Sequence, residues 1–513
     1  MARVVTEPFL DFDEDVGWWE PAPEPRAPPP RPRVRARRPP PRTLAGDLAR
    51  LRGAIARSPG VAGLVLLGAL LAVAFAVRVA TGGDGGAERA AKPPLAPPPA
   101  AAEPAVPAAE APVPAGPARP LRSGDRGAAV RDLQTTLAAL GYADAAPDGA
   151  FGPATASAVA AFQAASGLLA DGIAGSATFD ALRAGIADRA APAAVRAEEG
   201  LDRALRTGRL GTESAERYRA ALDDARSALT LLSPGRSAAI GAVLGTVGEH
   251  ADLYDPARAL ALFSMLEANT AHLSGKALPK ERFADIVGAD GAVYRYMPGH
   301  GFQFHPLANA ARLNALARRE KTEEARSLAD ALAARSVREG RGIAWEYYFP
   351  FGGPSRWTSA LAQAVAAQAL ARASLLIDDP RALTLARGAF RTLPGELSRP
   401  VEGGTWVREY GYSDMAVLNA QLQSLVSVSE YVELSGDEQA RAFGADLAAA
   451  SRTLLPRFDT GCWSLYALDG NPATPHYHAY HVSLLNQLAR STGEAIWAET
   501  AARWRGYERV GGC

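Results

Sequence analysis

The sequence predicts an all-α protein, with an α/α toroid-like helical domain carrying short β-hairpin loops, a small three-helix domain, and one transmembrane helix. Three observations support this fold class. Apolar residues recur at spacings of three and four in about ten segments after residue 190, as in amphipathic helices. The same spacing occurs within residues 121–187, where glycines follow the predicted helices. Residues 60–77 form an unbroken apolar run.

Composition divides the chain into five segments. We predict a disordered Pro/Arg-rich cytoplasmic tail, a transmembrane helix, a Pro/Ala-rich linker, the small domain and the large helical domain, over residues 1–59, 60–80, 81–120, 121–187 and 190–513. The proline-rich segments cannot bury enough apolar surface to offset the entropy of the chain. The formal net charge of zero argues against nucleic acid as a partner.

The apolar run GVAGLVLLGALLAVAFAV, residues 60–77, has no charged or polar side chain. At about 1.5 Å per residue it is long enough to span the hydrocarbon core, and it lies too far from residue 1 for a cleaved signal peptide. Arginines concentrate before it, with six in residues 31–42. The positive-inside rule therefore predicts a single-pass protein of the cell membrane, anchored in the lipid bilayer, with a cytoplasmic N-terminus and the rest outside. A buried helix of a soluble domain is the alternative.

The small domain has two predicted turns, Asp148-Gly149 and Asp171-Gly172, and Thr155 and Thr178 stand where helix N-caps are expected. Its pattern resembles the peptidoglycan-binding-like domain family, on Gly124, Gly127, Val130, Leu133-Gln134, Leu140-Gly141-Tyr142, Asp148-Gly149, Phe151-Gly152, Thr155, Phe162-Gln163 and Asp171-Gly172-Ile173. The resemblance implies binding of peptidoglycan or a related wall glycan. A structural spacer is the alternative.

Aromatic residues of the large domain concentrate between its predicted helices. They occur in VYRYMPGHGFQFHP, AWEYYFPFGGPSRW, GGTWVREYGYSD, RFDTGCWSLYALDG and PHYHAYH. In a toroid, loops at one end line a shared cleft. Aromatic side chains with interleaved acids and arginines suit sugar rings, which offer apolar faces and hydroxyl groups. Core packing is the alternative for any single cluster.

Four of these segments resemble the glucuronyl C5-epimerases. They are AWEYYFPFGGPSRWTSALAQ, WVREYGYSDMAVLNAQLQSL, LLPRFDTGCWSLYAL and YHAYHVSLLNQL, and their order and spacing agree with that family. The resemblance implies an isomerase acting on a glucuronate-containing polysaccharide. Together with the predicted membrane span and wall-binding domain, it leads us to expect a membrane-anchored extracytoplasmic enzyme whose substrate is a cell-wall or capsular polysaccharide. Such an enzyme removes the hydrogen on C5 and returns it to the opposite face, which requires an acid or base on each side of the ring.

Residue by residue, the resemblance makes Glu409 one base and Tyr477 the opposite one, with Tyr410 and Tyr466 as hydrogen-bonding or proton-relay groups. The substrate-binding candidates are Arg356, Trp357, Arg408, Asn419, His478, His481 and Tyr347. Among them, Arg356 or Arg408 is expected to hold the uronate carboxylate, and Asn419 to contact a hydroxyl. His478 and His481 are expected to orient or polarise Tyr477.

A metal site is the main alternative for the histidines. His476, His478 and His481 are spaced closely enough to share an ion, and Asp459 or Glu409 would complete the ligand set. We predict no metal and no cofactor, because the family resemblance explains the tyrosines as well.

Three other functions stay open at this point. A lyase shares the proton abstraction, a hydrolase would use two carboxylates among Glu346, Glu409 and Asp414, and a non-catalytic protein would only bind the glycan. The sequence also leaves open a homodimer and a bridge between Cys462 and Cys513.

Overall fold

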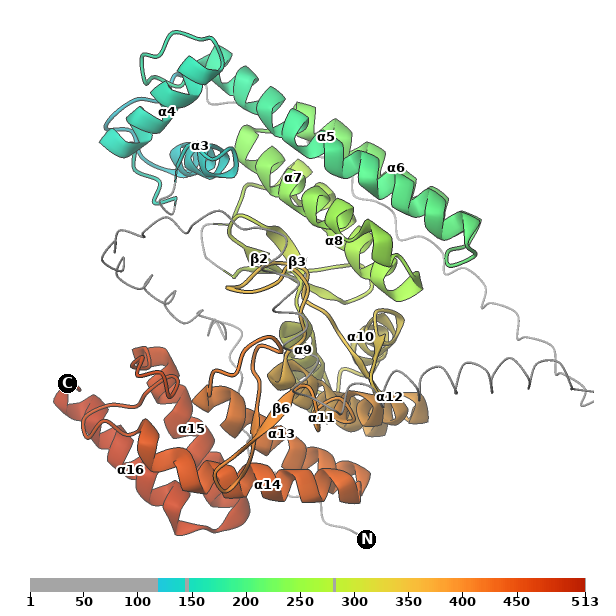
Figure 1. The fold of residues 1–513 in the computed structure, drawn as a ribbon, viewed down its shortest axis with the longest axis vertical. Coiled ribbons are helices and arrows are strands. Elements are labelled where there is room, and N and C mark those ends of the chain that lie inside the picture. Colours follow the sequence, from blue (N-terminus) through green and yellow to red (C-terminus); the bar gives the residue numbers. More distant parts are fainter. Residues whose placement is uncertain (1–118, 144–146, 280–282, 513) are drawn as a thin grey trace, which may run out of the picture. The chain divides into compact units, whose positions relative to one another are not determined.

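A computed structural model describes residues 119–143, 147–279 and 283–512, which all belong to one compact unit (Figure 1). The predicted tail, transmembrane helix and nearly all of the predicted linker lie outside the described residues. Within the described ranges, no helix combines the length and the apolar character that crossing a bilayer requires. The longest of them, α5 (Ser176–Arg206), carries charged residues throughout. The prediction of a single-pass membrane protein is therefore not supported by the described part of the chain.

The small domain is built from α3 (Ala128–Ala139), α4 (Pro153–Ala165) and the first part of α5. A glutamine side chain forms hydrogen bonds to each of its two turns. The Gln134 side chain donates to Asp148 Oδ1 over 2.7 Å and to Thr155 Oγ1 over 3.0 Å, and accepts from the Gly149 amide over 2.8 Å. Gln163 makes the same set of bonds, with Asp171, Thr178 and Gly172 as its partners. Both predicted turns are therefore present.

The two threonines have another role than predicted. The residues that precede α4 and α5 are Gly152 and Gly175, and neither helix start has a side-chain cap. Thr155 and Thr178 lie one turn inside their helices, where their hydroxyls accept from the two glutamines. The N-cap prediction was wrong because a neighbouring helix, rather than the local backbone, supplies the partner.

Helix α5 continues without a break through the predicted boundary at residues 187–190. The small domain also contacts α7 (Pro234–Glu249) through the buried carboxylate of Asp132 on α3. This carboxylate accepts from Ser233 Oγ over 3.1 Å and from the backbone amides of Gly235 and Arg236, so it caps the start of α7. A Cβ atom at position 235 would lie 2.2 Å from Asp132 Oδ1, which explains the glycine there.

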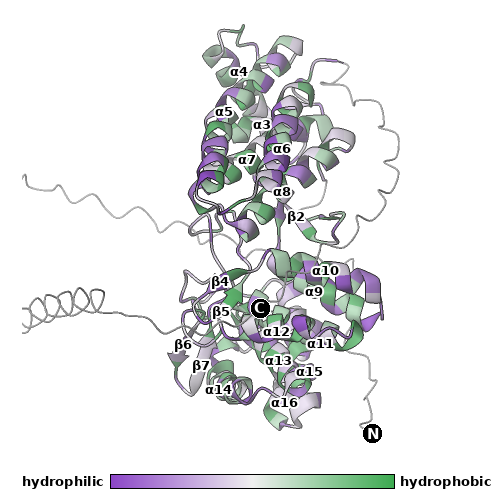
Figure 2. Cartoon of the chain, turned by 90° about the vertical axis from the view of Figure 1, so that its right-hand side faces the viewer, coloured by the Kyte–Doolittle hydropathy of each residue, from purple (hydrophilic) through white to green (hydrophobic). Residues whose placement is uncertain are grey.

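Helices α6 (Thr212–Leu231) and α8 (Pro256–Gly275) pack with α5 and α7 as a bundle. Hydrophilic and hydrophobic residues alternate along α5 and α6 (Figure 2). A three-stranded antiparallel sheet follows, formed by β1 (Asp285–Val287), β2 (Val293–Met297) and β3 (Gly301–Phe304) in that order. Tyr294 pairs with Phe304, and all residues of β2 and β3 are buried.

The remaining helices alternate between two layers. Helix α11 (Ala360–Leu376) packs between α9 (Pro306–Arg318) and α13 (Leu418–Ser435), and α13 also contacts α15 (Pro475–Thr492). Each of these four is followed by a helix that packs against it: α10 (Thr322–Ala334), α12 (Pro380–Phe390), α14 (Glu438–Leu454) and α16 (Ala495–Val510). Two short hairpins connect them, β4 (Val337–Glu339) with β5 (Gly342–Ala344) and β6 (Ser398–Val401) with β7 (Gly404–Val407). A mostly helical fold with hairpins is confirmed, whereas closure into a toroid is not.

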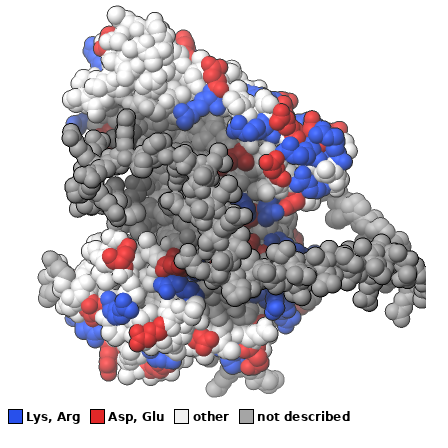
Figure 3. Space-filling view, in the orientation of Figure 1, with Lys and Arg blue, Asp and Glu red and all other residues white. Residues whose placement is uncertain are grey.

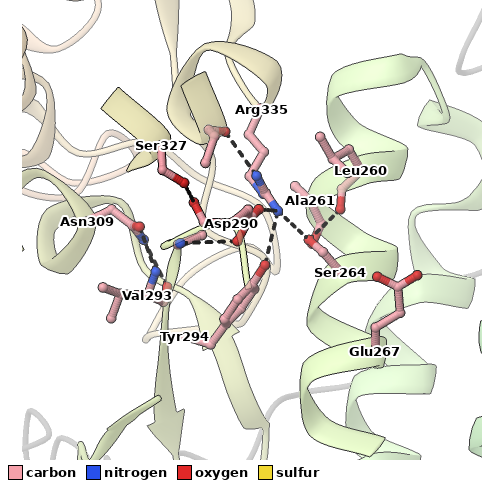
Figure 4. A network of polar contacts seen from close by, with 12 residues as sticks. Leu260, Ala261, Ser264, Glu267, Asp290, Val293, Tyr294, Asn309, Ser327 and Arg335 are labelled. Carbon is pink, nitrogen blue, oxygen red and sulfur yellow. Dashed lines mark hydrogen bonds and ion pairs between the residues drawn. The ribbon is translucent and has the colours of Figure 1, made fainter. Parts of the chain in front are cut away.

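A buried arginine joins the bundle to these helices. Arg335, just after α10, donates to Asp290 over 2.6 Å, to Ser264 of α8 over 3.1 Å and to the Tyr294 hydroxyl over 3.1 Å (Figure 4). Its side chain is 1% exposed, whereas that of Asp290 is 41% exposed. On the outer surface, acidic and basic side chains are interspersed over the described part of one face (Figure 3), in agreement with the net charge of zero.

Removing the two partners of this ion pair should have unequal effects. Asp290→Ala leaves the buried guanidinium without its countercharge, and we expect the free energy of unfolding to fall by about 3 kcal/mol. Arg335→Met removes the buried charge and leaves a partly hydrated carboxylate, so we expect a smaller loss. Urea unfolding followed by circular dichroism measures both, and equal losses would contradict this explanation.

Candidate active site

The candidate site centres on Glu409, which follows strand β7. Glu409 is 1% exposed. Its Oε2 accepts from the Tyr466 hydroxyl over 3.3 Å, and its Oε1 has no hydrogen-bond partner among the described residues. Burial disfavours the charged carboxylate and raises the pKa of Glu409 to about 8. A carboxyl group in this state can take up or release a proton near neutral pH.

The backbone around Glu409 is fixed from both sides. The Arg408 amide donates to Leu397 and its carbonyl accepts from Ala360 at the start of α11. The Gly411 amide donates to the Thr358 carbonyl over 2.9 Å, and a Cβ atom at position 411 would lie 2.9 Å from that oxygen. The start of α11 therefore determines where the carboxyl group points.

Tyrosines surround the carboxyl group. The hydroxyls of Tyr410 and Tyr466 are 3.4 Å apart, and the ring of Tyr477 lies edge-on to that of Tyr466 at a centroid distance of 4.9 Å. Burial raises the pKa values of Tyr410 and Tyr466 well above their usual range, so both remain hydroxyl donors at neutral pH. The structure thus brings together all four residues predicted to be catalytic.

Tyr347 and Trp357 form an aromatic wall next to this cluster. Their rings stack at 4.1 Å with an interplanar angle of 9°, and Trp357 lies 5.7 Å from the ring of Tyr410. The Tyr347 hydroxyl accepts from the Leu307 amide at the start of α9. Both predicted binding residues are therefore adjacent to the catalytic candidates, although each is almost fully buried.

The two predicted arginines bind acidic partners elsewhere. Arg356 forms an ion pair with Glu346, which Arg258 also binds through two hydrogen bonds of 2.9 and 3.0 Å. Arg408 donates to Asp414 over 2.8 Å and to two backbone carbonyls. Among the described residues, neither guanidinium hydrogen-bonds to Glu409 or to its tyrosines. Asn419, the second residue of α13, is buried, and its Oδ1 has no hydrogen-bond partner among the residues that the structure describes.

The histidines face away from the carboxyl group. His478 Nε2 donates to the Trp504 carbonyl over 3.0 Å, so its Nδ1 accepts from Ser464 Oγ over 2.8 Å. Ser464 Oγ then accepts from His481 Nδ1 over 3.0 Å. Burial lowers the pKa of His481 to about 3, which keeps it neutral. Both ring nitrogens of His478 are therefore bound away from Tyr477.

Helical spacing explains this separation. Tyr477 and Tyr480 are three residues apart on α15 and share one face, whereas His478 and His481 share the next face.

In the described ranges, no group of three metal-binding side chains is close enough to hold an ion.

Sequence reasoning missed Ser464, Tyr412 and Tyr480. Burial raises the pKa values of Tyr412 and Tyr480, and the charge of Glu409 adds to both shifts, so both residues lie near it. Tyr480 also donates to Gln423 Oε1 of α13 over 2.7 Å. The three-residue spacing from Tyr477 is the signal that would have identified Tyr480, whereas nothing in the sequence pairs Ser464 with two histidines.

Two parts of the chain match known families. Residues 339–506 match the family profile of the D-glucuronyl C5-epimerase C-terminus, and residues 126–182 match that of a putative peptidoglycan binding domain. Both predicted resemblances, and their order along the chain, are confirmed. The four catalytic candidates all fall within the first match, whereas residues 190–338 of the predicted large domain lie outside it.

Three curated proteins share parts of the sequence. A D-glucuronyl C5-epimerase from Caenorhabditis elegans is 30% identical over 179 residues, which are 30% of this chain and 29% of that protein. An uncharacterised protein from Methanocaldococcus jannaschii is 27% identical over 183 residues, which are 32% of this chain and 57% of that protein. A zinc D-Ala-D-Ala carboxypeptidase from Streptomyces albus G is 56% identical over 64 residues, which are 12% of this chain and 24% of that protein. The chain covers less than two thirds of each relative.

The buried carboxyl group should make stability depend on pH. Between about pH 5 and pH 8 the folded protein keeps a proton on Glu409 that the unfolded chain has released, so stability falls as pH rises, by about 1 kcal/mol per pH unit. Glu409→Gln has no such proton. We expect urea unfolding to show Glu409→Gln gaining stability relative to the wild type across this window. Glu216→Gln, at an exposed position, is the control, and a difference that does not change with pH would contradict the burial effect.

Proposed function

We propose that this protein is a uronyl C5-epimerase, an isomerase that acts on a glucuronate-containing cell-wall or capsular polysaccharide. The observation that carries the proposal is the buried Glu409 carboxyl, with its pKa raised to about 8, among Tyr410, Tyr466 and Tyr477. The match to the epimerase family and the worm epimerase support it. The match to the peptidoglycan binding family supports a wall glycan as the ligand of the small domain.

The reaction transfers one proton off C5 and one proton back. Deprotonated Glu409 takes the C5 hydrogen, and the electron pair left behind is delocalised into the adjacent carboxyl group of the uronate. Tyr477 delivers a proton to the opposite face and is restored by exchange with Glu409 or solvent. A general base is most effective when its pKa is close to the working pH, as burial arranges for Glu409. We assign Tyr410 and Tyr466 as hydrogen-bonding or proton-relay groups that stabilise the charge developing on the substrate.

Arg356 remains our proposed ligand for the uronate carboxylate. Its side chain is 39% exposed, and it immediately precedes Trp357 in the aromatic wall. When Arg356 turns to the substrate, Glu346 stays paired with Arg258 through two hydrogen bonds, so no buried carboxylate loses its countercharge. Arg408, held by Asp414 and two carbonyls, is the weaker candidate. Asn419 is proposed to bind a sugar hydroxyl through its buried amide oxygen.

The hydrolase alternative has less support. It needs a carboxylic acid and a second carboxylate on the two sides of the glycosidic bond. Glu346 is bound by two arginines, which lower its pKa, and Asp414 is held by Arg408. A lyase would use the same proton abstraction, and its product, an unsaturated uronate, distinguishes it.

Deuterium exchange tests the proposed reaction. The protein is incubated in deuterated water with glucuronate-containing polysaccharides, and C5 is followed by NMR. We expect deuterium at C5 and iduronate-type signals. Glu409→Gln and Tyr477→Phe should each slow exchange by about 10²-fold or more, because each removes one acid or base. Tyr431→Phe is the matched control, since that buried tyrosine bonds to Asp437 at the far end of α13.

Other products would refute the epimerase. Unsaturated uronate would identify a lyase, and new reducing ends a hydrolase. Full exchange in Glu409→Gln would refute the assigned base. Absence of exchange on a polysaccharide that binds would indicate a non-catalytic glycan-binding protein.

The exchange rate should also rise with pH. Glu409 acts as a base only when deprotonated, so we expect the initial rate to increase from pH 6 through pH 8 and to level off above pH 8. A rate that falls over this interval would show that the protonated carboxyl is the active form.

A further inference from the structure

The tyrosines assigned to the reaction come from separate elements of the fold. Tyr410 follows β7, Tyr466 lies in the loop between residues 459 and 474, and Tyr477 lies on α15. The contact between the rings of Tyr466 and Tyr477, at a centroid distance of 4.9 Å, is therefore a contact between that loop and α15. Because a misplacement of about 1 Å can cost about 10²-fold in rate, the loop and the helix have to be held in a fixed relative position.

Ser464, two residues before Tyr466, joins the loop to α15. Its hydroxyl donates to His478 Nδ1 over 2.8 Å and accepts from His481 Nδ1 over 3.0 Å. His478 directly follows Tyr477, and His481 comes three residues later on the same side of the helix as His478. The serine and both histidines are fully buried. One side chain of the Tyr466 loop thus holds the turn of α15 that carries Tyr477.

The direction of these hydrogen bonds is fixed. His478 Nε2 donates to the Trp504 carbonyl over 3.0 Å, which leaves Nδ1 as the acceptor for Ser464. The serine proton is then committed to His478, so His481 Nδ1 carries the hydrogen that the serine oxygen accepts. Burial lowers the pKa of His481 to about 3, which keeps both bonds in this arrangement at neutral pH. Buried hydrogen bonds that are fully paired in this way favour a single geometry.

Other contacts keep the first part of the loop folded. The ring of Trp463 stacks on that of His478 at 3.7 Å with an interplanar angle of 12°. The carboxylate of Asp459 accepts from the Trp504 ring nitrogen of α16 over 2.9 Å. Neither contact uses the hydroxyl of Ser464. Loss of this hydroxyl should therefore leave the loop folded and alter only how closely it is held to α15.

We propose that Ser464 is a positioning residue, which acts through His478 and His481 to set the distance between Tyr466 and Tyr477. Since Tyr466 donates to Glu409, the same bonds set the distance between the two groups assigned to proton transfer, Glu409 and Tyr477. Ser464 itself exchanges no proton with the substrate. This inference rests on the proposed function, because it assigns a role within the same site.

Ser464→Ala tests the role in turnover, followed by deuterium incorporation at C5. We expect kcat to fall at least about tenfold and KM to stay nearly unchanged, because the groups proposed to bind the polymer are not altered. Ser264→Ala is the matched control. Ser264 is a buried serine of α8 that accepts from Arg335 over 3.1 Å, so its loss also leaves a buried N–H with one partner fewer. A fall in kcat in Ser264→Ala as large as that in Ser464→Ala would show that lost stability is the cause, and would overturn the proposal.

His481 provides a second pair of variants. His481→Leu removes the donor to Ser464, whereas His481→Asn places an amide N–H near the position of the imidazole Nδ1. We expect His481→Asn to lose less kcat than His481→Leu. Equal losses in the two variants would show that the hydrogen bond to Ser464 has no part in turnover.

Backbone amide hydrogen exchange, measured by mass spectrometry, gives a result that does not depend on turnover. In Ser464→Ala we expect the amides of residues 464–480 to exchange at least about tenfold faster than in the wild type, and in Ser264→Ala we expect no change in this segment. Wild-type kcat together with wild-type amide exchange in Ser464→Ala would overturn the proposal. If the wild type incorporates no deuterium at C5, the proposed function fails, while amide exchange still decides whether Ser464 holds the loop on α15.

Discussion

The candidate site depends on a carboxyl group that is buried without a countercharge. Glu409 has one hydroxyl partner and one oxygen without a partner among the described residues. Such a group is costly when ionised, so the protein keeps it protonated to a higher pH than a glutamate in water. Rigid surroundings are needed to hold it there, and they are supplied by backbone bonds from residues on both sides to the start of α11. The same burial that costs stability gives the group a pKa suited to proton transfer.

Unlike the Glu409 carboxyl, which has no countercharge, three buried or partly buried arginines are paired with carboxylates. Arg335, Arg258 and Arg356 are each paired with a carboxylate and, for Arg335, with two hydroxyls. The pairs of Arg335 and Arg258 link α8 with the loops before β2 and α11. No cation of the described residues contributes to the pKa of Glu409, which is set by burial and by Tyr466. A cation that stayed beside Glu409 would lower its pKa and weaken it as a base.

The sequence was sufficient where a local motif carried the information. Helical periodicity predicted the helical class, and the resemblance to the glucuronyl C5-epimerases in the Glu-Tyr, LPRFDTG and Tyr-His segments predicted which four residues meet. It was insufficient where the outcome depends on a partner distant in the chain. Arg356 pairs with Glu346, and Thr155 accepts from Gln134, because the fold brings these residues together. His478 and Tyr477 are neighbours in sequence but lie on different faces of α15, which only a helical reading of PHYHAYH reveals.

The continuity of α5 has a mechanical consequence. Its 31 residues correspond to a rod about 46 Å long, and one end belongs to the domain that matches the peptidoglycan binding family. Pro192 removes one backbone hydrogen bond from α5. Helix α7 packs against α5 at Ala190 and Ala193, on either side of this proline, and so supports the helix there. Two helices thus form a stiff arm rather than a hinge. If the small domain binds a wall glycan, as we propose, the length of this arm determines how far from the bound glycan the helices that carry Glu409 can act.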